Sequence, residues 1–160
     1  MNDKVTKRLE NLRSRLREKG LDCLLISQAD NRRYLSGFTG SAGALIISAQ
    51  RTILATDFRY IEQSKIQAPQ YEVIQIKGEI ANWLPGLIAS LNINALGFEA
   101  DDIPYGEYAQ LADAISKGPS VKLIPTQGIV VELRARKDDY ETKIIRQAVA
   151  LADEAFSYLK

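Results

Sequence analysis

Hydrophobic positions in this chain of 160 residues follow two spacings, one typical of helices and one typical of strands. Val5, Leu9, Leu12 and Leu16 recur at steps of four and three residues, which predicts an amphipathic helix that ends at Gly20. Short apolar runs and alternating segments predict strands. These strands are expected over residues 23–27, 44–48, 52–56, 71–76, 95–99 and 121–125.

Further helices are predicted between the strands. Asp57 is a suitable N-cap for a helix that ends before Pro69. Either Asp30 or Asn31 is placed to cap a short helical turn over residues 32–35. Two more helices are expected over residues 80–91, where Pro85 either kinks the helix or marks its true start, and over residues 104–118.

The last segment is predicted to form a long helix. Asp138 and Glu141 have the spacing of a capping box, in which each side chain bonds the backbone of the other. No glycine or proline stops this helix before Lys160, so we expect it to belong to a longer protein. Its apolar stripe consists of Ile144, Ala148, Leu151, Ala155 and Leu159.

Alternating strands and helices predict an α/β fold, in which helices cover both faces of a central sheet. Only three residues separate the strands over 44–48 and 52–56, which indicates a hairpin. A hairpin is antiparallel, so the sheet should be mixed rather than all parallel.

Composition and charge narrow the functional classes. Apolar residues make up 46% and charged residues 26%, as in one globular domain, and the formal net charge of +1 creates no field that steers nucleic acid. The seven Lys and Arg residues of segment 4–19 fit the solvated face of the first helix. No apolar run is long enough for a membrane span, and the single Cys23 excludes an internal disulfide. We therefore expect a cytoplasmic protein that binds neither nucleic acid nor membrane.

The chain contains no histidine, which excludes Ser-His-Asp and Cys-His catalysis and every histidine-containing metal site. Ser41 lies in TGSAG, which lacks the first glycine of the G-x-S-x-G motif. The acidic pairs Asp101-Asp102 and Asp138-Asp139 are adjacent in sequence, so their side chains diverge. We expect neither a self-sufficient active site nor a metal site in this chain.

The stretch NRRYLSGFTGSAG, residues 31–43, places three glycines before an apolar strand. A phosphate site is disfavoured, because the stretch lacks the Lys-Ser/Thr ending of a P-loop and leads into a strand rather than a helix. A substrate-facing loop and a tight connection both remain open.

This stretch, the segment TDFRYIEQS at 56–64 and the closing RARKDDYETKIIRQAVALADEAF at 134–156 together resemble the creatinase/prolidase/aminopeptidase P family. The likeness is to its N-terminal domain, especially that of bacterial Xaa-Pro peptidases. It implies a ribonuclease H-like mixed sheet over residues 1–135, and a helix over 136–160 that leads into an absent catalytic domain with a pita-bread fold. The family's catalytic domain holds two divalent metals, expected to be manganese, through two Asp, one His and two Glu, and none of that set can be placed here.

The resemblance also suggests roles for single residues. In the family this domain packs against a catalytic domain, often that of a neighbouring subunit, and it helps to wall the substrate pocket. Tyr34 and Phe38 could offer ring faces to a proline-containing peptide, or they are core aromatics. Arg59 could bind a peptide carboxylate or an acid of another domain, or it pairs locally with Asp57 or Glu62. The loop glycines, Gly37, Gly40 and Gly43, are expected to provide backbone freedom, with at least one at positive φ.

Three functions follow from these observations. The leading one is the non-catalytic domain of a metal-dependent Xaa-Pro peptidase, which forms a homodimer and lines its substrate pocket. The second is a peptide-binding module of a metal-free, peptidase-like protein. The third is a stand-alone small-molecule binder that uses the glycine loop. Metal ligands encoded beyond Lys160 would distinguish the first from the second.

Overall fold

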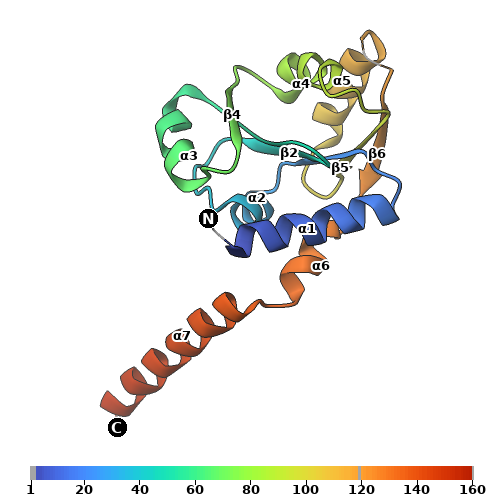
Figure 1. Ribbon diagram of the computed structural model, residues 1–160. Coiled ribbons are helices and arrows are strands. Elements are labelled where there is room, and N and C mark those ends of the chain that lie inside the picture. The colour runs from blue at the N-terminus through green and yellow to red at the C-terminus, as the bar shows by residue number, and fades with distance from the viewer. Residues whose placement is uncertain (1–2, 119, 160) are drawn as a thin grey trace.

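The computed structural model describes residues 3–118 and 120–159, which form a sheet with helices on both faces (Figure 1). The strand order in this sheet is β4-β3-β2-β1-β5-β6. The strands are β1 (Cys23–Ile26), β2 (Ala44–Ser48), β3 (Thr52–Thr56), β4 (Glu72–Gln75), β5 (Ala95–Glu99) and β6 (Lys122–Thr126). The helices are α1 (Asp3–Glu18), α2 (Ala29–Ser36), α3 (Ile61–Gln67), α4 (Ile80–Ala89), α5 (Tyr105–Ser116), α6 (Ile129–Ala135) and α7 (Asp139–Tyr158).

The sheet is mixed, as predicted. β2 forms the expected antiparallel hairpin with β3, in the register Leu45↔Leu54, and also pairs antiparallel with β1. Parallel pairing joins β1 to β5, β5 to β6 and β3 to β4. The predicted α/β fold with helices on both faces is therefore confirmed.

Alternate strand residues supply two separate cores. Leu24, Leu45 and Leu54 face α1, α2 and α6, whereas Leu25 and Ile46 face α4 and α5. Both faces are covered, so β1 and β2 are buried at every position. The four apolar residues predicted to form the stripe of α1 are all buried against the first of these cores.

Several predicted helix ends are confirmed. Gly20 has φ +65° after α1, and the Leu21 amide donates to the Leu16 carbonyl at 2.9 Å, as at a helix that ends in a left-handed residue. Asp57 accepts from the Arg59 amide and caps a short 3-10 helix, η1 (Phe58–Tyr60), which precedes α3. Pro85 lies inside α4 and does not mark its start.

One expectation about helices was wrong, and one helix was not predicted. The N-cap of α2 is neither Asp30 nor Asn31 but Gln28, whose side chain accepts from the Asn31 amide at 2.7 Å. The helix starts earlier because the Asn31 side chain is bonded elsewhere, to Glu99 and Arg134. Helix α6 was not predicted, since its β-branched start disfavours helix formation locally.

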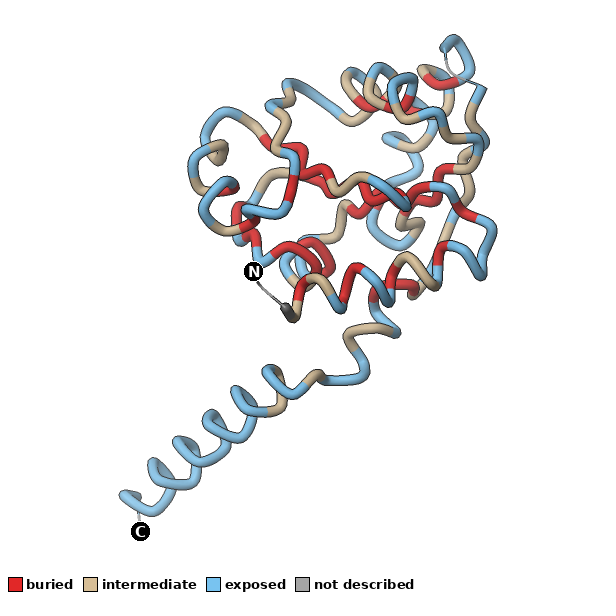
Figure 2. Tube along the Cα trace, in the orientation of Figure 1, coloured by how far each residue is buried: buried red, intermediate tan, exposed pale blue. Residues whose placement is uncertain are grey.

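Helix α7 extends away from the rest of the molecule, and almost its whole length is exposed (Figures 1 and 2). The predicted capping box of Asp138 and Glu141 is present. The apolar stripe has no cover, as Leu151 and Leu159 are 68% and 84% exposed. Among the described residues, no helix combines the length and apolar character that crossing a bilayer requires.

Candidate functional site

Five strands end at one edge of the sheet, which we call the carboxyl edge. β1, β3, β4, β5 and β6 all point the same way, and only β2 runs in the opposite direction. Ligands of open α/β sheets bind outside the carboxyl ends of the strands. A ligand-binding site is therefore expected at the carboxyl edge.

A cleft of about 590 Å³, the edge cleft, opens beside this edge. Its volume lies in the range of small-molecule sites. Two helices contribute to it, α4 through Ile80 and Trp83 and α5 through Glu107. The loops that follow β1, β3 and β4 line most of the rest, and the loop before β2 adds Ala42 and Gly43, next to Ala44 of β2. Its polar and aromatic lining includes Ser27, Asp57, Arg59, Lys77, Trp83 and Glu107.

Arg59 lines the edge cleft from η1 and pairs with Asp57. Its Nη2 lies 2.6 Å from the Asp57 Oδ2, and the Arg59 side chain remains 57% exposed. The side-chain hydrogen bond lowers the pKa of Asp57 and raises that of Arg59. Glu62, the other partner considered above, instead pairs with Lys65 at 2.7 Å. The local pair is thus present, while an exposed guanidinium still faces the cleft.

The glycine loop, residues 37–43, follows α2 and reaches the carboxyl edge. Gly37 and Gly43 have φ of +81° and +146°, which confirms the expectation of positive φ. Gly40 has an ordinary φ, but a Cβ there would lie 2.2 Å from the Phe38 ring. Two glycines are therefore needed for backbone conformation and the third for space.

Arg32, a buried cation of α2, holds the glycine loop in place. Its guanidinium donates to the carbonyls of Ser27, Gly40 and Gly43 at 3.2, 2.8 and 2.7 Å. Burial lowers the Arg32 pKa. The loop closes over Phe38, which is 1% exposed and belongs to the core that faces α1. Phe38 is therefore a core aromatic in this structure, which was the second of its two predicted roles. It does not line the edge cleft.

Tyr34 lies away from the edge cleft, where α1, α2 and α6 meet. The Arg8 guanidinium stacks on its ring, 4.0 Å from the centroid, and its hydroxyl donates to the Leu133 carbonyl at 3.4 Å. Burial raises the Tyr34 pKa. The three candidate side chains therefore lie apart, and of them only Arg59 lines the edge cleft.

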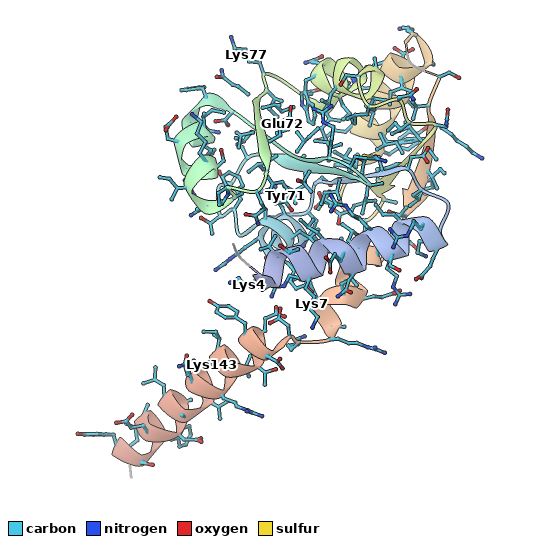
Figure 3. All side chains as sticks on the ribbon, in the orientation of Figure 1. Lys4, Lys7, Tyr71, Glu72, Lys77 and Lys143 are labelled. Atoms are coloured by element: carbon cyan, nitrogen blue, oxygen red, sulfur yellow. The ribbon has the colours of Figure 1, made fainter. Side chains whose placement is uncertain are left out.

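Arg8 also fixes the start of α7, and we call this set of contacts the α7 joint. Its guanidinium donates to Asp138 Oδ2 at 2.6 and 2.9 Å and to the Tyr34 carbonyl at 2.7 Å. Lys4 adds a cation–π contact, with Nζ 3.6 Å from the Tyr140 centroid. Although burial acts to raise the Asp138 pKa, the bonds from the Glu141 amide and Arg8 lower it. Figure 3 shows Lys4 and Lys7 on α1 facing the first turn of α7.

Glu99, at the end of β5, organises the other half of the carboxyl edge. Its carboxylate accepts from the Ser27 and Gln28 amides at 2.9 and 2.8 Å and from Asn31 Nδ2 at 2.6 Å. Burial raises its pKa, and the three bonds oppose that shift. Arg134 of α6 donates to Asn31 Oδ1 at 2.8 Å, which extends the network to another helix. Glu99 thereby anchors the segment that precedes α2 to the end of β5, which is a structural role.

No group of three or more Cys, Asp and Glu side chains within residues 3–118 and 120–159 is arranged to hold a metal ion. Cys23 is buried in β1, and burial raises the pKa of its thiol to about 12, which suits a core residue rather than a nucleophile. Ser41 Oγ lies 2.8 Å from the Tyr60 hydroxyl.

Sequence reasoning missed Trp83, Lys77 and Glu107 as cleft residues. They lie on α4, on the loop after β4 and on α5, and only the folded sheet brings them together. One signal was available, because Trp83 is the only tryptophan in the chain. Figure 3 shows Lys77 at the end of the molecule opposite α7.

Comparison with known proteins identifies the family. The creatinase/prolidase N-terminal domain family matches residues 8–136. The protein named "Uncharacterized peptidase YqhT" from Bacillus subtilis (strain 168) is 38% identical over 152 residues, which cover 95% of this chain but only 42% of that relative.

Solved structures agree with this match. The Xaa-Pro dipeptidase from Bacillus anthracis superposes with a TM-score of 0.87 at 40% identity, over 96% of this chain and 42% of that one. The N-terminal domain of the cytoplasmic peptidase PepQ from Mycobacterium tuberculosis H37Rv gives a TM-score of 0.73 at 36% identity, over 79% of this chain and 98% of that one. The chain thus spans less than half of the two longer relatives and nearly all of the isolated domain. It belongs to the creatinase/prolidase N-terminal domain family.

Proposed function

We propose that this chain is the non-catalytic N-terminal domain of a metal-dependent Xaa-Pro peptidase, which hydrolyses the bond that precedes proline. The observation that carries the proposal is the match to the Xaa-Pro dipeptidase of Bacillus anthracis, which extends over 96% of this chain but only 42% of that protein. We assign catalysis to the part of such a relative that this chain does not cover.

The exposed apolar face of α7 supports the proposal that another domain packs against this helix. Its large apolar side chains include Ile144, Ile145 and Val149, which are 47%, 48% and 54% exposed. A continuous apolar surface of this kind is typical of an interface. In the proposed parent protein this face packs against the catalytic domain, and the carboxyl edge contributes to the substrate pocket of a cytoplasmic homodimer.

The residues present do not fit a metal centre, since the sequence contains no histidine and its described acids do not gather. In the proposed parent, two Asp, one His and two Glu outside this sequence hold two divalent ions, which we expect to be manganese. A second candidate keeps the same fold but has lost those ligands, and then the chain is part of a peptide-binding module.

The test compares the 160-residue chain with the longer protein from the same gene. We expect the longer protein to release proline from Xaa-Pro peptides when manganese is added, and the chain alone to release none. Within the longer protein, Arg59→Ala and Arg59→Lys should raise KM or weaken dimerisation, because neither replaces a planar guanidinium. In the chain alone, both should melt near the wild-type temperature, since solvent screens an ion pair between exposed side chains and leaves it with little effect on stability.

Three results would contradict the proposal. Proline release by the repurified chain would place catalysis within it, and a longer protein without the metal ligands would favour the binding module. Unchanged kinetics and assembly of the longer Arg59→Ala variant would leave Arg59 with only its local pair.

A further inference from the structure

Helix α7 meets the domain at its first turn (Figure 1). Every described residue from Lys143 to Leu159 is exposed. Among the residues that the structure describes, none beyond Glu141 makes a side-chain hydrogen bond or an ion pair with the domain. The angle at which α7 leaves the domain therefore depends on the α7 joint and on the segment that precedes it.

The preceding segment does not fix this angle by itself. Arg136 and Lys137 join α6 to the N-cap of α7, and both are exposed. The backbone of Arg136 is extended, with φ −93° and ψ 107°, so α6 and α7 do not form one continuous helix. Each residue of such a segment has two soft backbone dihedrals, and rotation about them would tilt α7. The contacts of the joint are what oppose this rotation.

Arg8 is the centre of the joint and is held from several sides. Besides its bonds to Asp138 and to the Tyr34 carbonyl, its Nη2 lies 3.3 Å from Glu141 Oε2. The Tyr34 ring under the guanidinium is itself attached to α6, through the bond from its hydroxyl to Leu133. A planar guanidinium presents its donors in fixed directions, so the groups that it binds take fixed relative positions.

The length of α7 amplifies any change at the joint. Its 20 residues extend about 30 Å, so a tilt of about 10° moves its far end by about 5 Å. A misplacement of about 1 Å is enough to slow an enzyme about a hundredfold. The orientation of α7 therefore matters to whatever follows this helix in a longer protein.

We propose that Arg8 is a positioning residue, which sets the orientation of α7 and of the part of the longer protein that follows it. Arg8 acts through the Asp138 carboxylate and not by contact with a substrate. The inference rests on the proposed function only in assigning a catalytic domain to the part after α7. The orientation of α7 itself involves this chain alone.

The orientation is measured as the distance between two nitroxide labels on the 160-residue chain. The labels are attached through Gln50→Cys, in the exposed turn between β2 and β3, and through Ser157→Cys, near the exposed end of α7. Cys23 is buried, and burial raises the pKa of its thiol, so it should not react with the label. We expect a narrow distance distribution by pulsed electron paramagnetic resonance, which Arg8→Met broadens by about 5 Å or more.

Further variants separate the joint from helix formation. Asp138→Asn keeps a good N-cap but removes the charge that Arg8 binds, so α7 should stay helical by circular dichroism while the distance distribution broadens. Arg8→Lys replaces the planar fork by a single ammonium, so it should not preserve the narrow distribution. Arg15→Met is the matched control on α1, because Arg15 pairs only within its own helix, and it should leave the distribution narrow.

The longer protein provides the functional measurement. Arg8→Met and Asp138→Asn should raise KM for Xaa-Pro peptides about tenfold with a smaller change in kcat, since a displaced pocket wall weakens substrate binding. Arg15→Met should leave both constants unchanged. All variants are assayed below their melting temperatures, so a loss of stability alone would not move KM.

The proposal is overturned if the wild-type distance distribution is as broad as that of Arg8→Met, or if Arg8→Met and Arg15→Met give the same distribution. It is also overturned if Arg8→Met leaves KM unchanged in an active longer protein. A longer protein that releases no proline would instead contradict the proposed function, and the label distances would still decide whether Arg8 orients α7.

Discussion

At the scale of single residues, the glycine loop depends on its glycines for two physical reasons. Gly43 combines φ of +146° with a position in which a Cβ would lie 2.7 Å from the Ala55 carbonyl oxygen. Gly40 is limited by space alone, because a Cβ would overlap the buried Phe38 ring. The backbone angle φ alone does not show the need for glycine at position 40, because that need comes from the packing of Phe38.

We predict that Gly40→Ala and Gly43→Ala each lower the free energy of unfolding by about 1–3 kcal/mol. The overlap at Gly40 involves a buried ring, and that at Gly43 involves backbone, so neither relaxes easily. Urea unfolding of the 160-residue chain measures both losses.

Gly106→Ala is the matched control for these variants. It lies in α5 with open space around it, so alanine there should stabilise the helix by about 0.5–1 kcal/mol. If all three variants unfolded at the same urea concentration, the explanation given for the loop would be wrong.

At the scale of elements, the α7 joint connects parts of the chain that are far apart in sequence. Arg8 and Asp138 are separated by 130 positions, and Arg8 is 8% exposed. The same Asp138 carboxylate accepts from the Glu141 amide and caps α7. One carboxylate therefore both begins the helix and attaches it to α1, which determines the direction in which α7 leaves the domain.

Removing Arg8 should leave the Asp138 carboxylate without its cation. We predict that Arg8→Met lowers the free energy of unfolding by about 1–3 kcal/mol, in the range for losing hydrogen bonds to a charged group. Amides in the first turn of α7 should also exchange faster with solvent. Urea unfolding and hydrogen exchange measure the two effects.

The control is Arg15→Met on the same helix, where the arginine side chain is 46% exposed and pairs with Glu18 three residues away. That substitution should change stability by no more than about 0.5 kcal/mol. Equal effects of the two substitutions would show that Arg8 acts only as a surface charge.

At the scale of the whole molecule, most of α7 adds little to the stability of the domain formed by the sheet and its covering helices. None of the residues of α7 is buried, whereas the sheet has a core on each face. Hydrophobic stabilisation follows the apolar area removed from water, so most of α7 contributes little to the stability of the domain.

A chain that ends after Thr142 keeps Asp138, Glu141 and the whole core. We predict that its free energy of unfolding differs from that of the 160-residue chain by no more than about 0.5 kcal/mol. Urea unfolding checks this, and a loss of several kcal/mol would mean that α7 packs on the domain in solution.

The sequence by itself determined the features that depend on residues close to one another along the chain. The α1 stripe, the hairpin, the Asp57 cap and the Asp138–Glu141 box all arise from spacings of a few residues. The mixed sheet followed from these elements, and the family followed from three motifs in order. Periodicity and capping are local, so they can be read without coordinates.

Only the tertiary structure decided the features that depend on distant partners. Ile129 and Val130 are β-branched, yet α6 forms, because both side chains enter the core that faces α1. Phe38 is buried because the glycine loop folds over it, and Trp83 and Arg59 line one cleft only because the strands that precede them end at the same edge of the sheet. Local propensity is worth a few tenths of a kcal/mol per residue, whereas burying a large side chain is worth about 1.5–3 kcal/mol. Packing therefore overrides local preference, and packing is the part that one sequence does not show.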